Sequence, residues 1–329
     1  MLSWHAALWA LKGVVIDRLS VARVAAGLAV AWNTANDAIL AAGQKLLIND
    51  PTRFDRARVI GVDEHAWSHT RRGSKHVTVI IDLTPIRDGT DTSRLLDMVP
   101  GRSKKVFKAW LDAQTAEFRD GVEVVAMDGF SGYKTATAEE LPEATAVMDP
   151  FHVVALAGEK VDQCRQRVQQ ATLGHRGRSG DPLYGIRRVL HTGANLLIDK
   201  QITRLKAVFA SDEHVEVEAT WGIYQRIVAA YRHPDRAAGK TELQAVIDDL
   251  TDGVPTQLKE LITLGRTLKR RALDVLAYFD HPSNGPTEAI NARLEHLRGT
   301  ALGFRNLAHY ITRALLDTGG FRTELHPHL

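Results

Sequence analysis

The sequence has little of several features that would narrow its class at once. One cysteine, Cys164, stands among 329 residues, which excludes an internal disulfide and any zinc ribbon built from several cysteines. The 42 Lys and Arg against 39 Asp and Glu leave a net charge of +3, which excludes a polycationic tail protein. No run of about 18 uncharged apolar residues occurs, and no signal-type segment follows the first residue. These absences predict a cytoplasmic protein with no membrane partner.

The composition that remains is that of an ordinary globular protein, 44% hydrophobic and 25% charged. Its length predicts about two domains. Helical spacing dominates up to residue 50, β-type runs follow between residues 51 and 157, and helical spacing returns beyond them. With so small a net charge, any surface for nucleic acid must come from local clusters of basic residues.

Residues 20–40 have the spacing of two short helices separated by a turn. We expect Val24 of the first helix to face Trp32 of the second. This spacing is typical of a helix-turn-helix, which places its second helix near DNA, while an alanine-rich helical hairpin without a DNA role is the alternative. Asp37 favours the alternative, because a carboxylate repels phosphate. The polar residues expected to be exposed toward DNA are Asn33, Thr34 and Asn36.

Short β-branched runs predict a mixed sheet in the middle of the chain. A hairpin loop is expected at 70–75. Three of the runs end at an acid, namely Asp63, Asp128 and Asp149. The strands are expected at 59–63, 76–83, 94–99, 121–127 and 144–148, and helices at 103–118 and 132–140.

From residue 158 to 271 no convincing strand is expected, and two clusters of basic residues stand out in this helical block. Each cluster is interpreted either as a DNA-facing surface or as a solvated helix face, and charge runs are more commonly the latter. The second cluster lies just before the segment that carries Glu288. The first comprises Arg165, Arg167, Arg176, Arg178, Arg187 and Arg188, and the second Arg266, Lys269, Arg270 and Arg271.

Three acids could together hold metal ions. Asp63 and Asp128 each follow an apolar strand, at the sheet edge where α/β proteins commonly place their sites. Glu288 is the best third candidate, because Asn284 and Pro286 form a helix-start pattern that places it in the first turn. Such carboxylates bind Mg²⁺, with Mn²⁺ as an alternative, for in-line attack on a phosphodiester. An acid after a strand is more often a loop cap, so spacing alone leaves the metal site open.

Five strings along the chain carry a family resemblance. They are GVDEHAW from residue 61, VTVIIDL from 77, VVAMDGFSGY from 124, VMDPFHVV from 147 and NGPTEAINARLEHLRGTALGFRN from 284. Their content, order and separation are similar to those of bacterial insertion-sequence transposases of the ISL-three family. The resemblance covers nearly the whole chain, including the helix-turn-helix segment.

The resemblance implies an RNase H-like α/β fold with a DDE catalytic triad, here Asp63, Asp128 and Glu288, which are also the implied metal ligands. It implies Mg²⁺-dependent cleavage at transposon ends and strand transfer, by a homodimer on double-stranded DNA associated with the nucleoid. The long interval between the second and third acids implies a helical insertion inside the catalytic domain. The expected domains are 1–50 (helix-turn-helix), 51–157 (first part of the core), 158–270 (insertion) and 271–329 (second part of the core).

Asp149 and His152 match a D-x-x-H string that recurs in related transposases. His152 is interpreted as positioning DNA or the acidic site, with local packing as the alternative. Asp149 stands before Pro150 and is expected to be a helix N-cap, which is a structural role.

Two departures from the family pattern bear on DNA binding. Glu295 and Gly299 stand in the Glu288 helix at positions that are often basic in the family, so Arg293 and Arg298 are expected to compensate. Family members usually begin with a cysteine-rich zinc-binding segment. Its absence predicts a shortened form or an incomplete reading frame, and no zinc is expected in this chain.

Two other functions stay open from the sequence. A related nuclease of RNase H-like fold would hydrolyse a DNA or RNA junction without joining strands. A catalytically silent relic would bind DNA through the helix-turn-helix and the basic faces alone. The presence of all three acids in their motif contexts argues against the silent relic.

Overall fold

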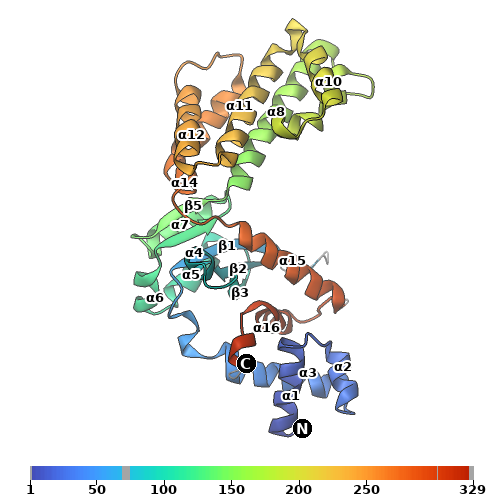
Figure 1. Cartoon of the computed structure of the whole chain (residues 1–329), viewed down its shortest axis with the longest axis vertical. Coiled ribbons are helices and arrows are strands. Elements are labelled where there is room, and N and C mark those ends of the chain that lie inside the picture. Colours follow the sequence, from blue (N-terminus) through green and yellow to red (C-terminus); the bar gives the residue numbers. More distant parts are fainter. Residues whose placement is uncertain (1, 69–74, 302, 326–329) are drawn as a thin grey trace. The chain divides into compact units, whose positions relative to one another are not determined.

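The computed structural model describes residues 2–68, 75–301 and 303–325, so most of the hairpin loop expected at 70–75 lies outside the described residues. The chain forms two compact units (Figure 1). The first combines Met1–Ala146 with Pro282–Leu329, and the second is Val147–His281, which contains the insertion expected over 158–270. Among the helices of the described ranges, none has both the length and the apolar character that a membrane span requires.

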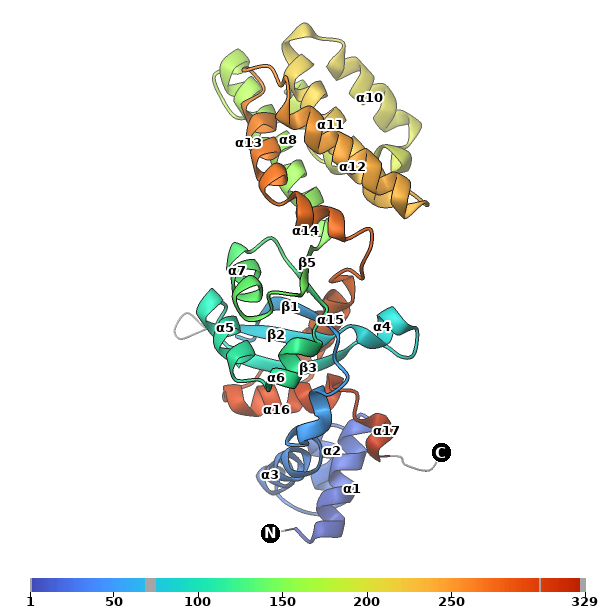
Figure 2. The same cartoon turned by 90° about the vertical axis from the view of Figure 1, so that its left-hand side faces the viewer.

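A five-stranded mixed sheet forms the centre of the first unit (Figure 2). In the order β3-β2-β1-β4-β5, β2 is antiparallel to β1 and β3, and β4 runs parallel to β1. The β-branched residues of these runs suit a pleated, buried surface. All five expected strands are present, at slightly different bounds. They are β1 (Val59–Ala66), β2 (His76–Asp82), β3 (Arg94–Pro100), β4 (Val124–Met127) and β5 (Thr145–Met148).

Helices cover both faces of this sheet (Figure 2). One face carries α5 (Lys104–Asp112), α6 (Ala116–Gly121) and α7 (Ser131–Glu140), and the other carries α15 (Gly285–Thr300) and α16 (Leu307–Thr318). Two short helices complete the set, α4 (Thr84–Asp88), which follows β2, and α17 (Arg322–Leu325), whose Leu325 packs with the N-terminal helices.

The first face buries Ile60 and Val62 of β1 against aromatic side chains of α5 and α7. The single helix expected at 103–118 is wrong, because it is broken into α5 and α6. Thr115 begins the second of these helices by accepting a hydrogen bond from the backbone N–H of Phe118. The Thr115 cap therefore starts α6 after α5 has ended at Asp112.

The N-terminal end of α15 lies directly against β1, and Gly61 allows that approach. A Cβ at Gly61 would stand 2.5 Å from Asn284 Oδ1 and 3.0 Å from Thr287 Oγ1. Asn284 Nδ2 donates to the Val62 carbonyl at 3.3 Å, and Thr287 Oγ1 donates to Asn284 Oδ1. Both of these side chains are buried. A helix from the end of the chain therefore docks on the central strand through a small polar contact.

Three N-terminal helices share a core with α16 in the first unit. Their Ser3 and Ser20 N-caps accept backbone hydrogen bonds from the first turns that follow. Gly43 permits close packing, since a Cβ there would stand 2.7 Å from Leu316 Cδ2. The helices are α1 (Trp4–Val15), α2 (Val21–Gly27) and α3 (Trp32–Gly43).

Two expectations for α3 are wrong. Trp32, expected to face Val24, is 51% exposed, because it is the first residue of the helix and precedes its buried row. Asn36, expected to be exposed, is only 4% exposed. It lies one helical turn before the buried Leu40, so both residues are on the side of α3 that faces the interior.

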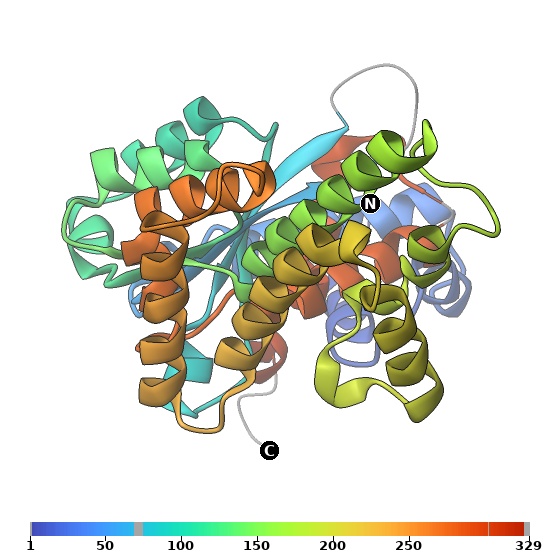
Figure 3. The same cartoon turned by 90° about the horizontal axis from the view of Figure 1, so that it is seen from above.

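The second unit consists mainly of helices (Figures 1 and 3). Within it α8 packs against α11, α11 against α12, and α12 against α13. The N-cap expected at Asp149 is confirmed, because its carboxylate accepts from the Phe151 N–H at 2.7 Å with Pro150 at the first helical position. The helices are α8 (Pro150–Leu173), α9 (Pro182–Ile186), α10 (Asp199–Phe209), α11 (Val215–Arg232), α12 (Arg236–Thr251), α13 (Lys259–Arg270) and α14 (Ala272–Ala277).

We expect Gly61→Ala to lower the unfolding free energy by about 1–3 kcal/mol, because the new methyl group would overlap the Asn284 side chain. Urea denaturation measures this loss. Gly299→Ala is the matched control on α15, where a Cβ would meet no atom within 4 Å among the described residues, and we expect it to be neutral or stabilising. Equal stability of Gly61→Ala and the wild type would contradict the close approach.

Candidate active site

Asp63 and Asp128 stand side by side on neighbouring strands. Val62 pairs with Met127 in the parallel register of β1 and β4, so the next residues along the two strands lie at the same level. Side chains alternate between the faces of a strand. Asp63 therefore shares the face of Gly61, which is the face covered by α15.

Asp63 was expected at the end of its strand, and this detail is wrong. β1 continues to Ala66, because residues 60–66 remain paired with β2. Asp128 follows the last residue of β4, as expected, and accepts a hydrogen bond from the Phe130 N–H at 2.8 Å. One carboxylate is thus held within a paired strand and the other in the turn after a strand.

Glu288 lies in the first turn of α15, as the helix-start pattern predicted. It belongs to a row of residues three or four positions apart that includes Asn284 and Asn291. Asn284 contacts the backbone of Val62, and Asn291 contacts the side chain of Asp63. The exposed Glu288 side chain is therefore bracketed by two residues that touch β1.

Asn291 is a site residue that the sequence reasoning missed. Its Nδ2 donates to Asp63 Oδ2 at 2.9 Å across 228 residues of sequence. Its Oδ1 is buried and has no hydrogen-bond partner within the described part of the chain. The available signal was its position three residues after Glu288 in the string NGPTEAIN, which places both on one side of a helix.

The donors at this face fit a hard divalent cation. Asp63 and Asp128 provide carboxylate oxygens, and the Asn291 Oδ1 beside them lacks a partner among the described residues. Oxygen-only donors suit Mg²⁺. Within the described ranges no three His, Cys, Asp or Glu side chains are grouped closely enough for one ion, so Glu288 does not complete a preformed cluster.

Tyr133 of α7 lies near the acidic residues of β1 and β4. It is 1% exposed, and its hydroxyl is 3.4 Å from Thr78 Oγ1 on β2. Burial raises the pKa of Tyr133 to about 12, and the charges of Asp128, Glu64 and Asp63 add to the increase. Negative charge from both candidate catalytic acids therefore reaches this one buried phenol.

Glu295 and Arg298, further along α15, take part in contacts within the unit. Glu295 Oε1 is 3.9 Å from His65 Nε2, and the same His65 nitrogen lies 2.8 Å from the Tyr310 hydroxyl. Arg298 donates to the Ala66 carbonyl at 3.2 Å and also pairs with Glu295. The expectation that Arg298 compensates for this acid at a DNA surface is not favoured, because its guanidinium is already used to hold α15 on β1.

The remaining residues expected to contact DNA fall into three groups. Asn33 is exposed and Thr34 partly buried on α3, whereas Asn36 is buried. Arg293 is partly buried and lines cavities within the first unit. Those in the second unit, which carries none of the three acids, are His152, Arg270 and Arg271.

Within the second unit, Arg271 does not present a free basic surface. It is 8% exposed, and its Nε is 2.5 Å from Asp274 Oδ2. Arg270 and Lys269 are exposed. The first basic cluster also contains an arginine that is already paired, because Arg167 forms salt bridges with Glu216 and Glu260. Counting basic residues along the sequence therefore overestimated the positive charge that each cluster presents to DNA.

A comparison with family models finds a match over residues 60–314 to the transposase model of the ISL-three family, of the DDE type. The chain is 26% identical over 300 residues to the transposase for insertion sequence element IS1557 of Mycobacterium tuberculosis, covering 83% of this chain and 63% of that protein. It is 24% identical over 279 residues to the transposase for IS1001 of Bordetella parapertussis, covering 79% and 61%. The chain thus spans just over three fifths of the length of these curated relatives.

We expect Tyr133 to make stability depend on alkaline pH. The pKa of Tyr133 is near 12 in the folded protein, against 10 for an ordinary phenol. The buried neutral phenol therefore contributes fully to stability below pH 10, and this contribution is lost as the pH rises to 12. The loss is about 2–3 kcal/mol. Urea denaturation of the wild type and Tyr133→Phe between pH 10 and 12 measures this loss, because the difference in their unfolding free energies should change steadily with pH.

Asp128→Asn should reduce that difference, because one of the charges that raise the pKa is removed. A gap between wild type and Tyr133→Phe that stays constant from pH 10 to 12 would show that the phenol ionises normally.

Proposed function

Because the chain belongs to the ISL-three family of insertion-sequence transposases, we propose that Asp63, Asp128 and Glu288 form the catalytic centre of an enzyme that cleaves DNA at the ends of an insertion sequence and transfers the strands to target DNA. The supporting observation is the Asn291–Asp63 hydrogen bond, which fixes the helix of Glu288 on the strand of Asp63. Asp128 follows β4 at the level of Asp63 in the parallel register, so the two aspartates share one face of the sheet.

We assign the central sheet to the RNase H-like fold and the N-terminal helices to a helix-turn-helix. Three antiparallel strands followed by a parallel strand on the other side of β1 support the first assignment. Two short helices, α2 and α3, support the second, with Trp32 and Asn33 exposed at the start of α3. In this arrangement α3 would approach DNA through its first turn.

The proposed reaction is an in-line displacement at phosphorus. In cleavage, a water oxygen forms a bond to phosphorus while the opposite P–O bond breaks, which leaves a 5′-phosphate and a free 3′-hydroxyl. In strand transfer, that 3′-hydroxyl oxygen forms a bond to a target phosphorus while the target's P–O3′ bond breaks, so one phosphodiester replaces another and a target 3′-hydroxyl is released. Bound Mg²⁺ or Mn²⁺ would supply charge neutralisation for the attacking and leaving oxygens. Asp63, Asp128 and Glu288 would hold the ions. No covalent link between protein and DNA forms.

Asn291 would act as a positioning residue. Its Nδ2 donates to Asp63 Oδ2 while the Glu64 N–H donates to Asp63 Oδ1, so the carboxylate is held in one orientation, and the buried Asn291 Oδ1 beside it has no hydrogen-bond partner among the described residues. Glu288, exposed in the first turn, must approach the strand acids when cations and DNA are present. Like charges disfavour that approach in the absence of a cation.

We expect Asp63→Asn, Asp128→Asn and Glu288→Gln each to reduce cleavage of a DNA carrying the element's ends by about 10²-fold or more, because positioning of the reacting groups depends on each acid. Gel analysis of end-labelled DNA with Mg²⁺ measures the rate. Glu64→Gln is the matched control on β1, since Glu64 lies on the opposite face and pairs with Arg102. Unchanged cleavage in any of the three variants would remove that residue from the proposed centre.

The products of the same assay separate the alternatives. Joined strands in the presence of target DNA support the transposase. Cut ends that are never joined favour a nuclease, and binding without cleavage under Mg²⁺ or Mn²⁺ favours a silent DNA-binding protein.

We expect Asn291→Ala to weaken Mn²⁺ binding by about 10–100-fold, as loss of groups that orient metal ligands commonly does. Isothermal titration calorimetry measures the affinity directly, without DNA. Ala292→Ser is the control on the same helix, at an exposed position. Equal Mn²⁺ affinity in Asn291→Ala and wild type would contradict the positioning role.

A further inference from the structure

A second site in the first unit combines a buried arginine with a cavity. Arg313 of α16 is 9% exposed, and its Nη1 is buried with no hydrogen-bond partner among the residues that the structure describes. The side chain lines a cavity of about 320 Å³ between the α1–α2 turn, α15 and α16. We propose that this cavity binds a phosphate group of the DNA backbone, with Arg313 as its central ligand.

The guanidinium of Arg313 has a reason to attract an anion. Burial lowers its pKa, and the negative charge of Asp317 opposes that shift. An arginine nevertheless stays protonated in proteins, so the charge must be balanced rather than lost. A buried N–H with no acceptor is costly, and a phosphate oxygen would satisfy both the charge and the hydrogen bond.

The other residues of the cavity favour the same ligand. Arg18 of the α1–α2 turn and Arg293 and His296 of α15 line it together with Arg313, and Asp317 is the acid in its lining. Arginine suits phosphate because its planar fork donates two hydrogen bonds at once. Three guanidinium groups around one opening therefore give a cationic site.

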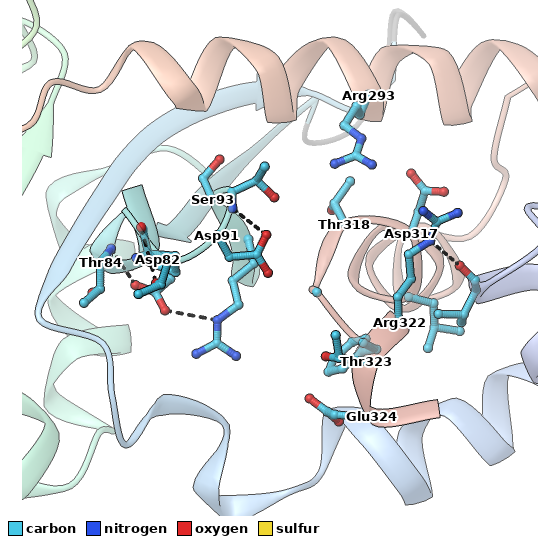
Figure 4. Close-up of a pocket in the computed structure, with 18 of the residues that line it drawn as sticks. Asp82, Thr84, Asp91, Ser93, Arg293, Asp317, Thr318, Arg322, Thr323 and Glu324 are labelled. Atoms are coloured by element: carbon cyan, nitrogen blue, oxygen red, sulfur yellow. Dashed lines mark hydrogen bonds and ion pairs between the residues drawn. The ribbon is translucent and has the colours of Figure 1, made fainter. Parts of the chain in front are cut away.

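A larger adjoining cavity, of about 750 Å³, lacks this excess of positive charge. Figure 4 shows it with Asp82, Asp91, Asp317 and Glu324 on its walls, and Arg293 extending from α15 toward Thr318. Asp82 there is already paired with Arg94 at 3.0 Å. Arg94 of the larger cavity is thus engaged by an acid, whereas the buried Arg313 Nη1 has no hydrogen-bond partner among the described residues.

The position on α15 relates this cavity to the proposed catalytic centre. Glu288 and His296 are eight residues apart on one helix, which is about 12 Å along its axis. Successive base pairs rise about 3.4 Å, so this length corresponds to roughly three or four nucleotides. One DNA strand could therefore reach both places. The choice of DNA as ligand rests on the proposed function, but binding at this cavity needs no cleavage.

The test is fluorescence anisotropy of the full chain with a labelled duplex in EDTA, over a series of salt concentrations. Loss of one phosphate contact makes the plot of log K against log salt shallower by about 0.9. For Arg313→Gln we expect this change and an affinity about tenfold weaker at low salt. Arg18→Gln alters an exposed residue of the same cavity and should show a change in the same direction without disturbing the core.

Arg53→Gln is the matched control for loss of a buried arginine. Arg53 is 7% exposed in the same unit, but its guanidinium donates to the carbonyls of Ile48 and Leu96. We expect it to lower the melting temperature and leave the salt slope unchanged. If Arg313→Gln does not fold, the Arg18→Gln slope decides.

A wild-type salt slope in folded Arg313→Gln, or in Arg18→Gln when that variant decides, would overturn the proposal. So would an equal loss of slope in Arg53→Gln. A parallel melt in sodium phosphate, against sodium chloride of equal ionic strength, separates free phosphate from DNA. Stabilisation by inorganic phosphate that disappears in Arg313→Gln, with no change in DNA slope, would assign the cavity to a free anion and overturn the DNA assignment. Because EDTA removes divalent cations, failure of cleavage in the catalytic assay has no bearing on these slopes.

Discussion

The first unit depends on a small polar contact between β1 and a helix that lies more than 200 residues away in sequence. Asn284 donates to the Val62 carbonyl, Thr287 donates to Asn284, and Asn291 donates to Asp63. Each of these groups would be costly if buried without its partner. The contact has little tolerance, because β1 contributes a glycine at the point of closest approach. It joins two chain segments that the second unit interrupts.

This contact serves both stability and the proposed chemistry. Apolar packing alone would hold a helix on a sheet, but it would not define the rotation of the helix about its axis. Asn284 and Asn291 define that rotation, since they lie on one row and reach β1 at successive residues. Glu288 lies between them on the same row. The residues that dock the helix are thus the residues that determine where the third acid stands, and a shift in one would displace the other.

Sequence reasoning predicted the parts of the fold that local rules govern. The β-branched runs predicted the strands, and the spacing of apolar residues predicted α2 and α3. Proline directly after Asp149, and two residues after Asn284, indicated the starts of α8 and α15. It failed where tertiary contacts decide. The extension of β1 beyond Asp63 follows from pairing with β2, and the burial of Asn36 follows from the side of α3 that the tertiary packing turns to the interior. Asn291 shares one side of a helix with Glu288 in the sequence, but only its hydrogen bond to Asp63 across the fold identifies it as a site residue.

Charge was the property that the sequence described least well. Arg167, Arg271 and Arg298 look like members of basic surfaces when read along the chain, yet each is engaged by acids or carbonyls of its own unit. Arg313 belongs to no cluster in sequence, yet its buried Nη1 lacks an acceptor within the described ranges and the residue lines a cavity. The free energy of a charged group depends on what remains unpaired after folding, not on how many like charges precede it. For a protein with a net charge of only +3, a nucleic-acid surface is therefore to be sought where a buried guanidinium N–H lacks an acceptor, and Arg313 in the proposed phosphate cavity meets that condition among the described residues.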